Sequence, residues 1–437
     1  MRTVDIISKK RNGGANTEAE IKFLTDGFVS GAVADYQMSA WLMAVCLKGM
    51  NHEETQILTR AMIDSGEVLD LSTIKCKKAD KHSTGGVGDT TTLILAPLVA
   101  ACGGCVAKLS GRGLGATGGT IDKLESIKGL STECDGQFFE KTVGELGLCV
   151  ASQSASLVPA DKLMYALRDV TATVDSIPLI ASSIMSKKIA AGADVIVLDV
   201  KFGNGAFMKT VEEAEALAWE MVNIGHRMGR ETMAILTNMN EPLGMAIGNG
   251  LEVREAIDAL SLRVGNDTPL MQVSTFIAKQ MLMLSGVAGD GAEADALVGE
   301  ALHSGRALEK LRSMCAALGG DTSCFDNLDE LVNVKKHIPV YCGEGYIKQV
   351  DALSIGNAAC ILGAGRQKKT DKIDHAVGLM LHKRVGDHVK NNEPVATLYV
   401  NDETKAEEAA NLVKTAFVLS NEEIEVKSPI YKIVRKV

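Results

Sequence analysis

The sequence predicts an α/β protein with a helical domain, a larger α/β domain with a mostly parallel sheet, and a small C-terminal lobe of mixed β structure. Residues 1–68 and 157–192 are predicted to be helical. Residues 70–155 and 193–330 alternate strands with helices, which is typical of parallel sheets with crossover helices. Residues 331–437 hold short strands separated by turn signals, which indicates the C-terminal α+β lobe.

Local signals place the individual elements in chain order. Asn51 can cap a helix, and Glu54 stands three residues later, as in a capping box. Apolar Leu58, Met62 and Ile63 follow at helical spacing. The further expected elements are a strand at 106–109, a helix at 138–146, a strand at 195–198, a helix at 211–228, a strand at 233–236, and lobe strands at 338–341, 378–381 and 394–400.

Length and composition narrow the class of protein. A chain of 437 residues suggests two or three domains, and only 4% aromatic residues predict a tight, aliphatic core. The net charge of −9 argues against a nucleic-acid or acidic-membrane partner but allows an anionic substrate, because the potential of a cavity is local. We expect neither a signal peptide nor a membrane span, because no apolar run is long enough for either.

Ten cysteines are scattered along the chain, mostly in apolar contexts, which favours a reducing, cytoplasmic location. Cys102 and Cys105 form a C-x-x-C pair, but no second pair or histidine stands at zinc-ligand spacing. Close packing of small residues is favoured here over redox chemistry.

The stretch from Lys81 to Thr92, Lys-His-Ser-Thr-Gly-Gly-Val-Gly-Asp-Thr-Thr-Thr, is the most informative motif. It combines cations, hydroxyls and glycines just before an apolar run that predicts a helix. Glycines let backbone N–H groups approach a ligand, and such groups at a helix start bind anions. The stretch lacks the Gly-Lys-Ser/Thr of the nucleotide P-loop. It predicts another kind of phosphate site, with an ordinary surface loop as the alternative.

A second Gly-rich stretch runs from Ser110 to Thr120, after the expected strand 106–109. Its glycines also satisfy G-x-G-x-x-G, which keeps a dinucleotide-binding interpretation open, although Asp135 only loosely meets the acid that this fingerprint needs. The hydroxyls of Ser110 and Thr120, with Lys108 before them, favour another interpretation. Two loops at successive strand ends can hold one phosphate from two sides.

Arg168, Ser183 and Lys187 form a third group. Ser183 and Lys187 are four residues apart, so they share one face of a helix. Together with Arg168 they can present donors to a flat polar ligand with carbonyl oxygens. The alternative is solvated helix charge, which describes most arginines and lysines.

These motifs resemble the thymidine/pyrimidine nucleoside phosphorylase family, and most closely its bacterial pyrimidine nucleoside phosphorylases. The resemblance lies in Lys81–Asp89, in Ser110–Gly115 with Thr117–Glu125, and in Tyr165–Ile180. It extends over nearly the whole chain. It implies an active-site cleft between the helical and α/β domains, a homodimer, and a cytoplasmic transferase of nucleoside salvage. The implied reaction is reversible phosphorolysis of uridine, thymidine or deoxyuridine to free base and (deoxy)ribose 1-phosphate.

The resemblance also implies the site residues. The phosphate site falls on Lys81, Ser83, Thr92, Lys108, Ser110 and Thr120. The pyrimidine site falls on His82, Arg168, Ser183 and Lys187. A potassium ion is implied as a cofactor, with inorganic phosphate as co-substrate. The implied ligands of the potassium ion are Gly88, Thr90, Leu243, Ala246 and Glu255, most of them through main-chain carbonyls.

The implied chemistry needs no nucleophilic side chain, because phosphate attacks C1′ of the sugar. Arg168 and Lys187 are expected to stabilise the negative charge that develops on the leaving base. His82 is expected to donate a proton or a hydrogen bond to a base carbonyl, since histidine titrates near neutral pH.

The chain departs from the family pattern at Ala116, where the family usually has histidine. The loop from Val200 to Gly205 also carries larger residues than usual. Three alternatives stay open: a deoxyribose-restricted thymidine phosphorylase, a non-catalytic nucleoside- or phosphate-binding protein, and, more distantly, a dinucleotide-dependent oxidoreductase. Lys108 favours the broad enzyme, because it resembles the phosphate loop of that subgroup.

Overall fold

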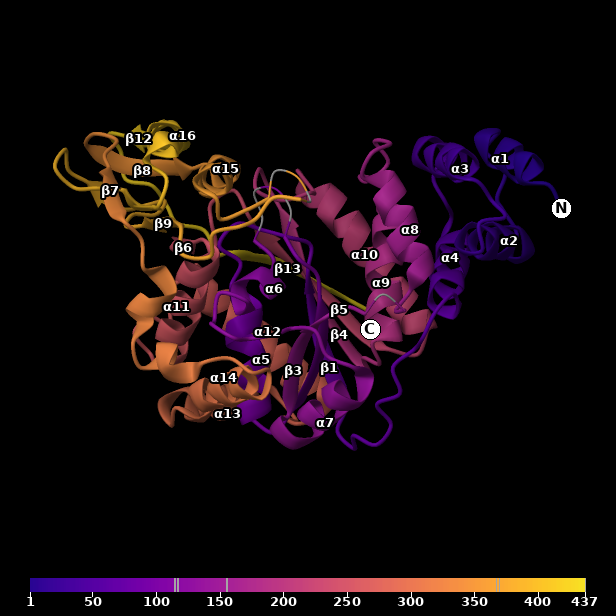
Figure 1. Ribbon diagram of the computed structural model, residues 1–437, viewed down its shortest axis with the longest axis horizontal. Coiled ribbons are helices and arrows are strands. Elements are labelled where there is room, and N and C mark those ends of the chain that lie inside the picture. Colours follow the sequence, from indigo (N-terminus) through magenta and orange to yellow (C-terminus); the bar gives the residue numbers. More distant parts are fainter. Residues whose placement is uncertain (114, 116–117, 155, 367, 369, 437) are drawn as a thin grey trace.

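The computed structural model describes residues 1–437 except 114, 116–117, 155, 367, 369 and 437. Its first helices lie at one side, the main sheet with its helices lies in the middle, and the C-terminal lobe lies at the other side (Figure 1). This is the architecture that the sequence predicted.

The helical domain is assembled from two separate parts of the chain, because α4 packs against α9. The capping box predicted at Asn51 is confirmed: Asn51 Oδ1 accepts from Glu54 N at 2.8 Å, and Glu54 Oε2 accepts from Asn51 N at 3.1 Å. Glu54 is also paired with Lys10, at 2.6 Å and out of solvent, so the cap fastens α4 to α1. The helices are α1 (Thr3–Arg11), α2 (Glu18–Val29), α3 (Asp35–Lys48), α4 (His52–Asp64), α8 (Pro159–Arg168) and α9 (Ile177–Ala190).

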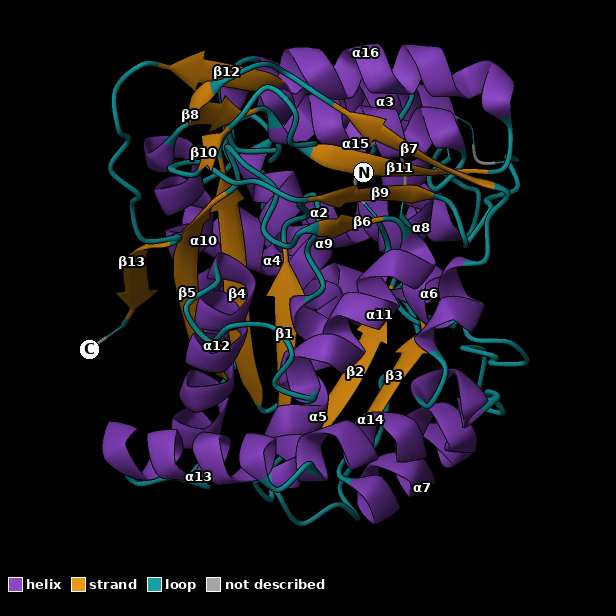
Figure 2. Ribbon diagram, turned by 90° about the vertical axis from the view of Figure 1, so that its left-hand side faces the viewer, coloured by secondary structure: helices purple, strands orange, loops and turns teal. Residues whose placement is uncertain are grey.

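The main sheet has the strand order β13-β5-β4-β1-β2-β3, and Figure 2 shows these strands side by side. All neighbours pair in parallel except β13, which runs antiparallel to β5. The strands are β1 (Lys78–Ser83), β2 (Cys105–Ser110), β3 (Leu148–Ser152), β4 (Val195–Phe202), β5 (Glu231–Asn238) and β13 (Ile430–Arg435).

Helices cover the sheet, and the buried side chains between them are almost entirely aliphatic, as the low aromatic content predicted. Helix α10 packs on β4 and β5, whereas α5 and α12 pack on β2 and β1 respectively. The helices of the α/β domain are α5 (Thr91–Ala101), α6 (Thr120–Leu124), α7 (Gly136–Leu146), α10 (Val211–Arg227), α11 (Asn249–Leu260), α12 (Pro269–Ser285), α13 (Gly291–His303) and α14 (Arg306–Ala317).

The C-terminal lobe contains a β6-β9-β11-β7 sheet and a β10-β8-β12 sheet. Strand β6 comes from the α/β part of the chain, so the first of these sheets joins the two regions. The elements are β6 (Ala246–Ile247), η1 (Thr322–Phe325), η2 (Leu328–Val332), β7 (Lys336–Val340), β8 (Gly345–Val350), α15 (Ala352–Leu362), β9 (Gly378–Leu381), β10 (His388–Val389), β11 (Ala396–Val400), η3 (Glu403–Lys405), α16 (Ala406–Ala416) and β12 (Phe417–Ser420).

Strand β13 lies within the range expected for the lobe but pairs with β5 of the main sheet. Its residues, Ile-Tyr-Lys-Ile-Val-Arg, mix apolar and charged types without strict alternation. A local pattern of this kind carries no information about which sheet the strand joins. The strands expected at 338–341, 378–381 and 394–400 are confirmed as β7, β9 and β11.

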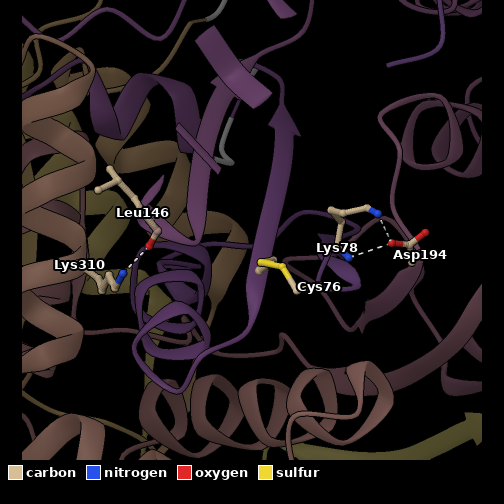
Figure 3. The surroundings of a disulfide bond; sticks show 6 residues. Cys76, Lys78, Leu146, Asp194 and Lys310 are labelled. Carbon is tan, nitrogen blue, oxygen red and sulfur yellow. Dashed lines mark hydrogen bonds and ion pairs between the residues drawn. A yellow bond between two sulfur atoms is a disulfide. The ribbon is translucent and has the colours of Figure 1, made fainter. Parts of the chain in front are cut away.

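A disulfide joins Cys76, just before β1, to Cys105, the first residue of β2 (Figure 3). The interpretation of Cys105 as a small residue that only packs is therefore wrong. Its partner comes from the segment before β1 and not from the C-x-x-C pair. Nearby, Lys78 Nζ lies 2.7 Å from Asp194 Oδ2, at the amino ends of β1 and β4. In the part of the chain that is described, no helix has both the length and the apolar character needed to cross a membrane.

Candidate active site

A cavity of about 690 Å³ opens at the carboxyl ends of β1 and β2, facing α8 and α9. Ligands of open α/β sheets bind at this edge, where loops leave parallel strands. All the residues assigned to phosphate or pyrimidine line this cavity, and so the structure brings the three motifs together. They are Lys81, His82, Ser83, Thr92, Lys108, Ser110, Thr120, Arg168, Ser183 and Lys187.

In and beside the first Gly-rich loop, hydrogen bonds and ion pairs fix the positions of Lys81 and Ser83. Lys81 Nζ donates to Thr91 Oγ1 at 2.6 Å and lies 3.2 Å from Asp199 Oδ2. Ser83 Oγ donates to Asp89 Oδ2 at 2.5 Å. These contacts fix a cation and a hydroxyl at the cavity wall, next to the first turn of α5.

The second Gly-rich loop is braced by Asp122 of α6. Asp122 Oδ2 accepts from Gly113 N at 2.7 Å, and its Oδ1 lies 2.9 Å from Arg366 Nη1 of the C-terminal lobe. Gly115 N donates to the carbonyl of Arg366 at 2.9 Å. The lobe therefore contacts a loop of the cavity directly. Ala116 lies outside the described residues.

The opposite wall carries Arg168 and Lys187. Arg168 donates from Nε to the Thr173 carbonyl at 3.1 Å, from Nη2 to that of Val174 at 2.8 Å, and from Nη1 to that of Leu179 at 3.1 Å. A guanidinium has five N–H donors, so these bonds leave donors for a ligand.

Lys187 shares a helix face with Ser183, as their spacing predicted. Its Nζ donates to Ser183 Oγ at 3.0 Å and to Asp161 Oδ2 at 2.7 Å. The Tyr165 ring lies 5.8 Å from that ammonium. This wall therefore offers cations, a hydroxyl and an aromatic face close together, which suits a planar polar ring.

Burial and the surrounding cations set the protonation of the cavity. Burial, reinforced by Lys188, Lys108, Lys187 and Lys81, holds the pKa of His82 well below its usual range. His82 is therefore neutral at physiological pH. A neutral imidazole can donate an N–H hydrogen bond, but it carries no additional proton to transfer, so of the two roles expected for His82 only the hydrogen bond fits.

Burial also lowers the pKa of the Lys108 ammonium to about 7, against the opposing effect of Asp80. The charge of Lys108 consequently changes near neutral pH. Burial lowers the pKa of Arg168 as well, but a guanidinium stays protonated in proteins.

The segments assigned to potassium meet beside the first loop. Leu243 N donates to the Val87 carbonyl, and Gly244 N to that of Gly88, both at 3.0 Å. Gly88 has a φ of +63°, and a Cβ there would lie 3.1 Å from Gly244 N, so glycine suits this close approach. Thr90 Oγ1 donates to Glu252 Oε2 at 3.0 Å.

Glu255 brings a carboxylate to the same place. Its Oε1 accepts from Met245 N at 2.7 Å, whereas its buried Oε2 accepts no hydrogen bond from the described residues. Burial raises the pKa of Glu255 to about 8. An orphaned carboxylate oxygen near main-chain carbonyls fits a weakly bound monovalent cation. No cluster of three His, Cys, Asp or Glu side chains suited to a metal occurs among the described residues.

Three family models match the chain. Residues 4–66 match a glycosyl transferase family helical bundle domain, residues 75–308 a glycosyl transferase family a/b domain, and residues 346–420 a pyrimidine nucleoside phosphorylase C-terminal domain. The pyrimidine-nucleoside phosphorylase of Staphylococcus haemolyticus is 54% identical over 92% of this chain and 93% of its own. The chain belongs to the pyrimidine-nucleoside phosphorylase family.

Another relative is the pyrimidine-nucleoside phosphorylase of Geobacillus stearothermophilus, 53% identical over 92% of this chain and 93% of that protein. The crystal structure of anthranilate phosphoribosyltransferase from Thermus thermophilus has a TM-score of 0.59 at 20% identity. It covers 72% of this chain and 99% of that one, and shows a shared fold.

Three polar residues of this phosphorylase family member were missed from the sequence. Lys188 lines the cavity beside Lys187; Asp161 binds Lys187, and Asp80 binds Lys188. The only sequence signal that could have identified Lys188 as a site residue is its position next to Lys187. Nothing local marks the two aspartates, because their partners come from other elements.

Proposed function

We propose that this protein catalyses the reversible phosphorolysis of pyrimidine nucleosides, uridine, thymidine and deoxyuridine, to free base and (deoxy)ribose 1-phosphate in nucleoside salvage. One observation carries the proposal: a single cavity has a wall of lysines and hydroxyls from two Gly-rich loops, and a facing wall with Arg168, Ser183 and Lys187. The first suits a phosphate, and the second suits a pyrimidine with its carbonyl oxygens.

Phosphate is held by Lys81, Lys108 and the loop hydroxyls, with one oxygen directed at C1′ of the sugar. That oxygen forms a bond to C1′ as the bond from C1′ to the base nitrogen breaks, and the electron pair of the broken bond passes to the base. The proton that hydrogen phosphate loses as the ester forms balances the one that the base takes up to become the neutral free base. The sugar gains oxocarbenium character in the transition state. Holding both reactants in one cavity replaces a collision in water by a positioned encounter.

Negative charge develops on the leaving base, and the wall with Arg168, Ser183 and Lys187 stabilises that charge. The Lys187 ammonium is held by Asp161 and Ser183, so it needs no reorientation as that charge develops. Arg168 adds a planar pair of donors. Neutral His82 donates a hydrogen bond to a base carbonyl. Such preorganised donors usually supply the largest share of catalysis.

Water would compete with phosphate for the sugar, so we propose that the helical and α/β domains close over the substrates. The cavity supports this, because its walls come from both domains.

We also propose potassium as the resident cation. Gly88, Thr90, Leu243, Ala246 and Glu255 would hold it, and its chemistry there is to neutralise the buried Glu255 carboxylate and brace the first Gly-rich loop. The orphaned Glu255 Oε2 supports this assignment.

We also propose a homodimer in the cytoplasm, on the basis of the family resemblance. Apolar side chains on the helical domain support the dimer: Tyr36, Leu47 and Val170 are each about three-quarters exposed, at 76%, 74% and 77%. Analytical ultracentrifugation tests the dimer, and cell fractionation tests the location.

The activity is tested by following the ultraviolet absorbance of uridine, thymidine and deoxyuridine with the protein, with and without phosphate. We expect cleavage of all three only with phosphate. Cleavage of thymidine and deoxyuridine alone would indicate the deoxyribose-restricted enzyme, and no cleavage would indicate a binding protein. The Lys187→Ala variant tests the base side of the site, and we expect its kcat/KM to fall by about a hundredfold or more. Near-normal turnover would remove Lys187 from the site.

A further inference from the structure

Asp80 is a fully buried carboxylate beside the phosphate wall that the proposed chemistry does not use. Its Oδ2 lies 2.7 Å from Lys188 Nζ of α9, and its Oδ1 lies 3.4 Å from Lys108 Nζ of β2. One carboxylate on β1 thus joins two lysines that come from two other elements.

Both lysines are fixed by main-chain carbonyls as well. Lys108 Nζ donates to the carbonyl of Lys81, and Lys188 Nζ donates to that of Leu109 at 3.0 Å. These carbonyls belong to β1 and β2, close to where the Gly-rich loops begin. The ammonium groups are therefore held next to the expected position of the phosphate.

Charged groups of both signs face the Lys108 ammonium. From β1 it faces Asp80, Lys81 and His82, and from α9 it faces Lys188. Burial and both lysines disfavour the charged form of Lys108, and Asp80 favours it. His82 stays neutral here, so it adds no charge at physiological pH.

We propose that Asp80 is a positioning residue for phosphate: its carboxylate holds the ammonium groups of Lys108 and Lys188 at the cavity wall. The inference rests on the proposed function, because it takes Lys108 to be a phosphate ligand. Asp80 itself touches no reacting atom and acts through the two lysines.

The test measures the affinity of inorganic sulfate by isothermal titration calorimetry between pH 5.5 and 9. Sulfate keeps its double charge throughout this range, whereas phosphate titrates within it, so any change of affinity with pH reports the protein. In the unsubstituted protein we expect affinity to fall as pH rises through about 7, where Lys108 loses its proton.

Asp80→Asn removes the neighbouring charge that favours the Lys108 ammonium. An opposite charge at this distance typically shifts a pKa by about 1–3 units. The pH at which sulfate affinity has fallen halfway, the midpoint, should therefore move toward acid by about that much. At pH 7 sulfate should bind about fivefold weaker or worse. The affinity should recover as pH falls, which a general loss of structure would not produce.

Lys188→Met provides a test in the opposite direction. Without Lys188, one cation that repels the Lys108 ammonium is gone, and Lys108 is the lysine that remains paired with Asp80 in this group. The midpoint should therefore move toward higher pH. This variant decides the question if Asp80→Asn does not fold. Asp80→Glu should keep a midpoint near that of the unsubstituted protein.

Asp194→Asn is the matched control, because Asp194 pairs with Lys78 at the far end of the same strands. Its midpoint should not move. An unshifted midpoint in Asp80→Asn, or an acid shift in Lys188→Met, would overturn the inference. Lys108→Met tests the phosphate assignment separately: unchanged phosphate KM there would remove Lys108 from the site, whatever the Asp80 variants show.

Discussion

Arg168 has two tasks that a different cation cannot combine. Its guanidinium donates to the carbonyls of Thr173 and Val174, between α8 and α9, and to that of Leu179 in α9, while it faces the base side of the cavity. A lysine presents a single ammonium in place of this planar fork. The residue therefore shapes the cavity wall as well as supplying charge.

We expect Arg168→Lys to lose most of the activity that Arg168→Ala loses. Hydrogen bonds to charged groups contribute about 1.5–3 kcal/mol each, so kcat/KM for uridine should fall about ten- to a hundredfold in both variants. Steady-state kinetics measure this, and the thermal midpoint of each variant separates misfolding from lost binding. Arg168→Lys with nearly full kcat/KM would show that charge alone is sufficient.

The phosphate wall gives a prediction of a different kind. Lys81→Ala or Ser110→Ala removes a donor from phosphate but not from the base side, so the KM for phosphate should rise about ten- to a hundredfold. The binding of uridine should change little. Initial rates with phosphate varied at saturating uridine provide the measurement. If phosphate dependence is the same in both variants as in the parent, the two-loop phosphate site is wrong.

At the scale of elements, the Cys76–Cys105 disulfide ties the segment before β1 to the start of β2, across a sequence separation of 29 residues. Closing a loop of that length restricts the unfolded chain and should contribute about 3–4 kcal/mol to stability. The bond lies at the amino ends of the strands, whereas the cavity lies at their carboxyl ends.

We therefore expect Cys76→Ser to lower the free energy of unfolding by about 2–4 kcal/mol while kcat stays unchanged. Urea titration without reductant measures the first, and uridine phosphorolysis the second. With reductant present, parent and variant should unfold at nearly the same urea concentration. Equal unfolding without reductant would mean that the bond does not form in solution.

At the scale of the whole molecule, the C-terminal lobe reaches the cavity through Arg366, which contacts Gly115 and Asp122. Arg366→Ala should loosen the second Gly-rich loop and raise the phosphate KM about two- to tenfold, which is the effect of one lost hydrogen bond. Arg312→Ala removes a similar arginine–aspartate pair, 2.7 Å apart and distant from the cavity. Phosphate kinetics that respond equally to both variants would contradict a specific role of the lobe.

Much of this fold was predictable because its signals are local. The capping box at Asn51 and the apolar strands such as Val195–Leu198 are written in adjacent residues, and periodicity alone locates them. The same holds for the Gly-rich loops, whose composition carries the phosphate hypothesis. Arg168, Ser183 and Lys187 needed more, because spacing by itself favoured solvated helix charge over a binding role.

Other features depend on contacts between distant segments, which spacing does not encode. Asp80 and Asp161 gain their importance from lysines on α9, and Cys105 from a cysteine on the far side of α5. The pKa of His82 is held well below its usual range first by burial and then by four lysines that come from three elements. Such effects of burial and charge appear only when the chain is folded.

The antiparallel pairing of β13 with β5 has a consequence for the order in which this protein is built. During synthesis β5 emerges from the ribosome long before Ile430–Arg435, and until then the main sheet has an open edge. Unpaired edges are templates for pairing with other chains, and contacts between distant segments form slowly. A nascent chain therefore carries an exposed β5 edge while residues 239–429 are synthesised, and the final strand covers that edge once it docks.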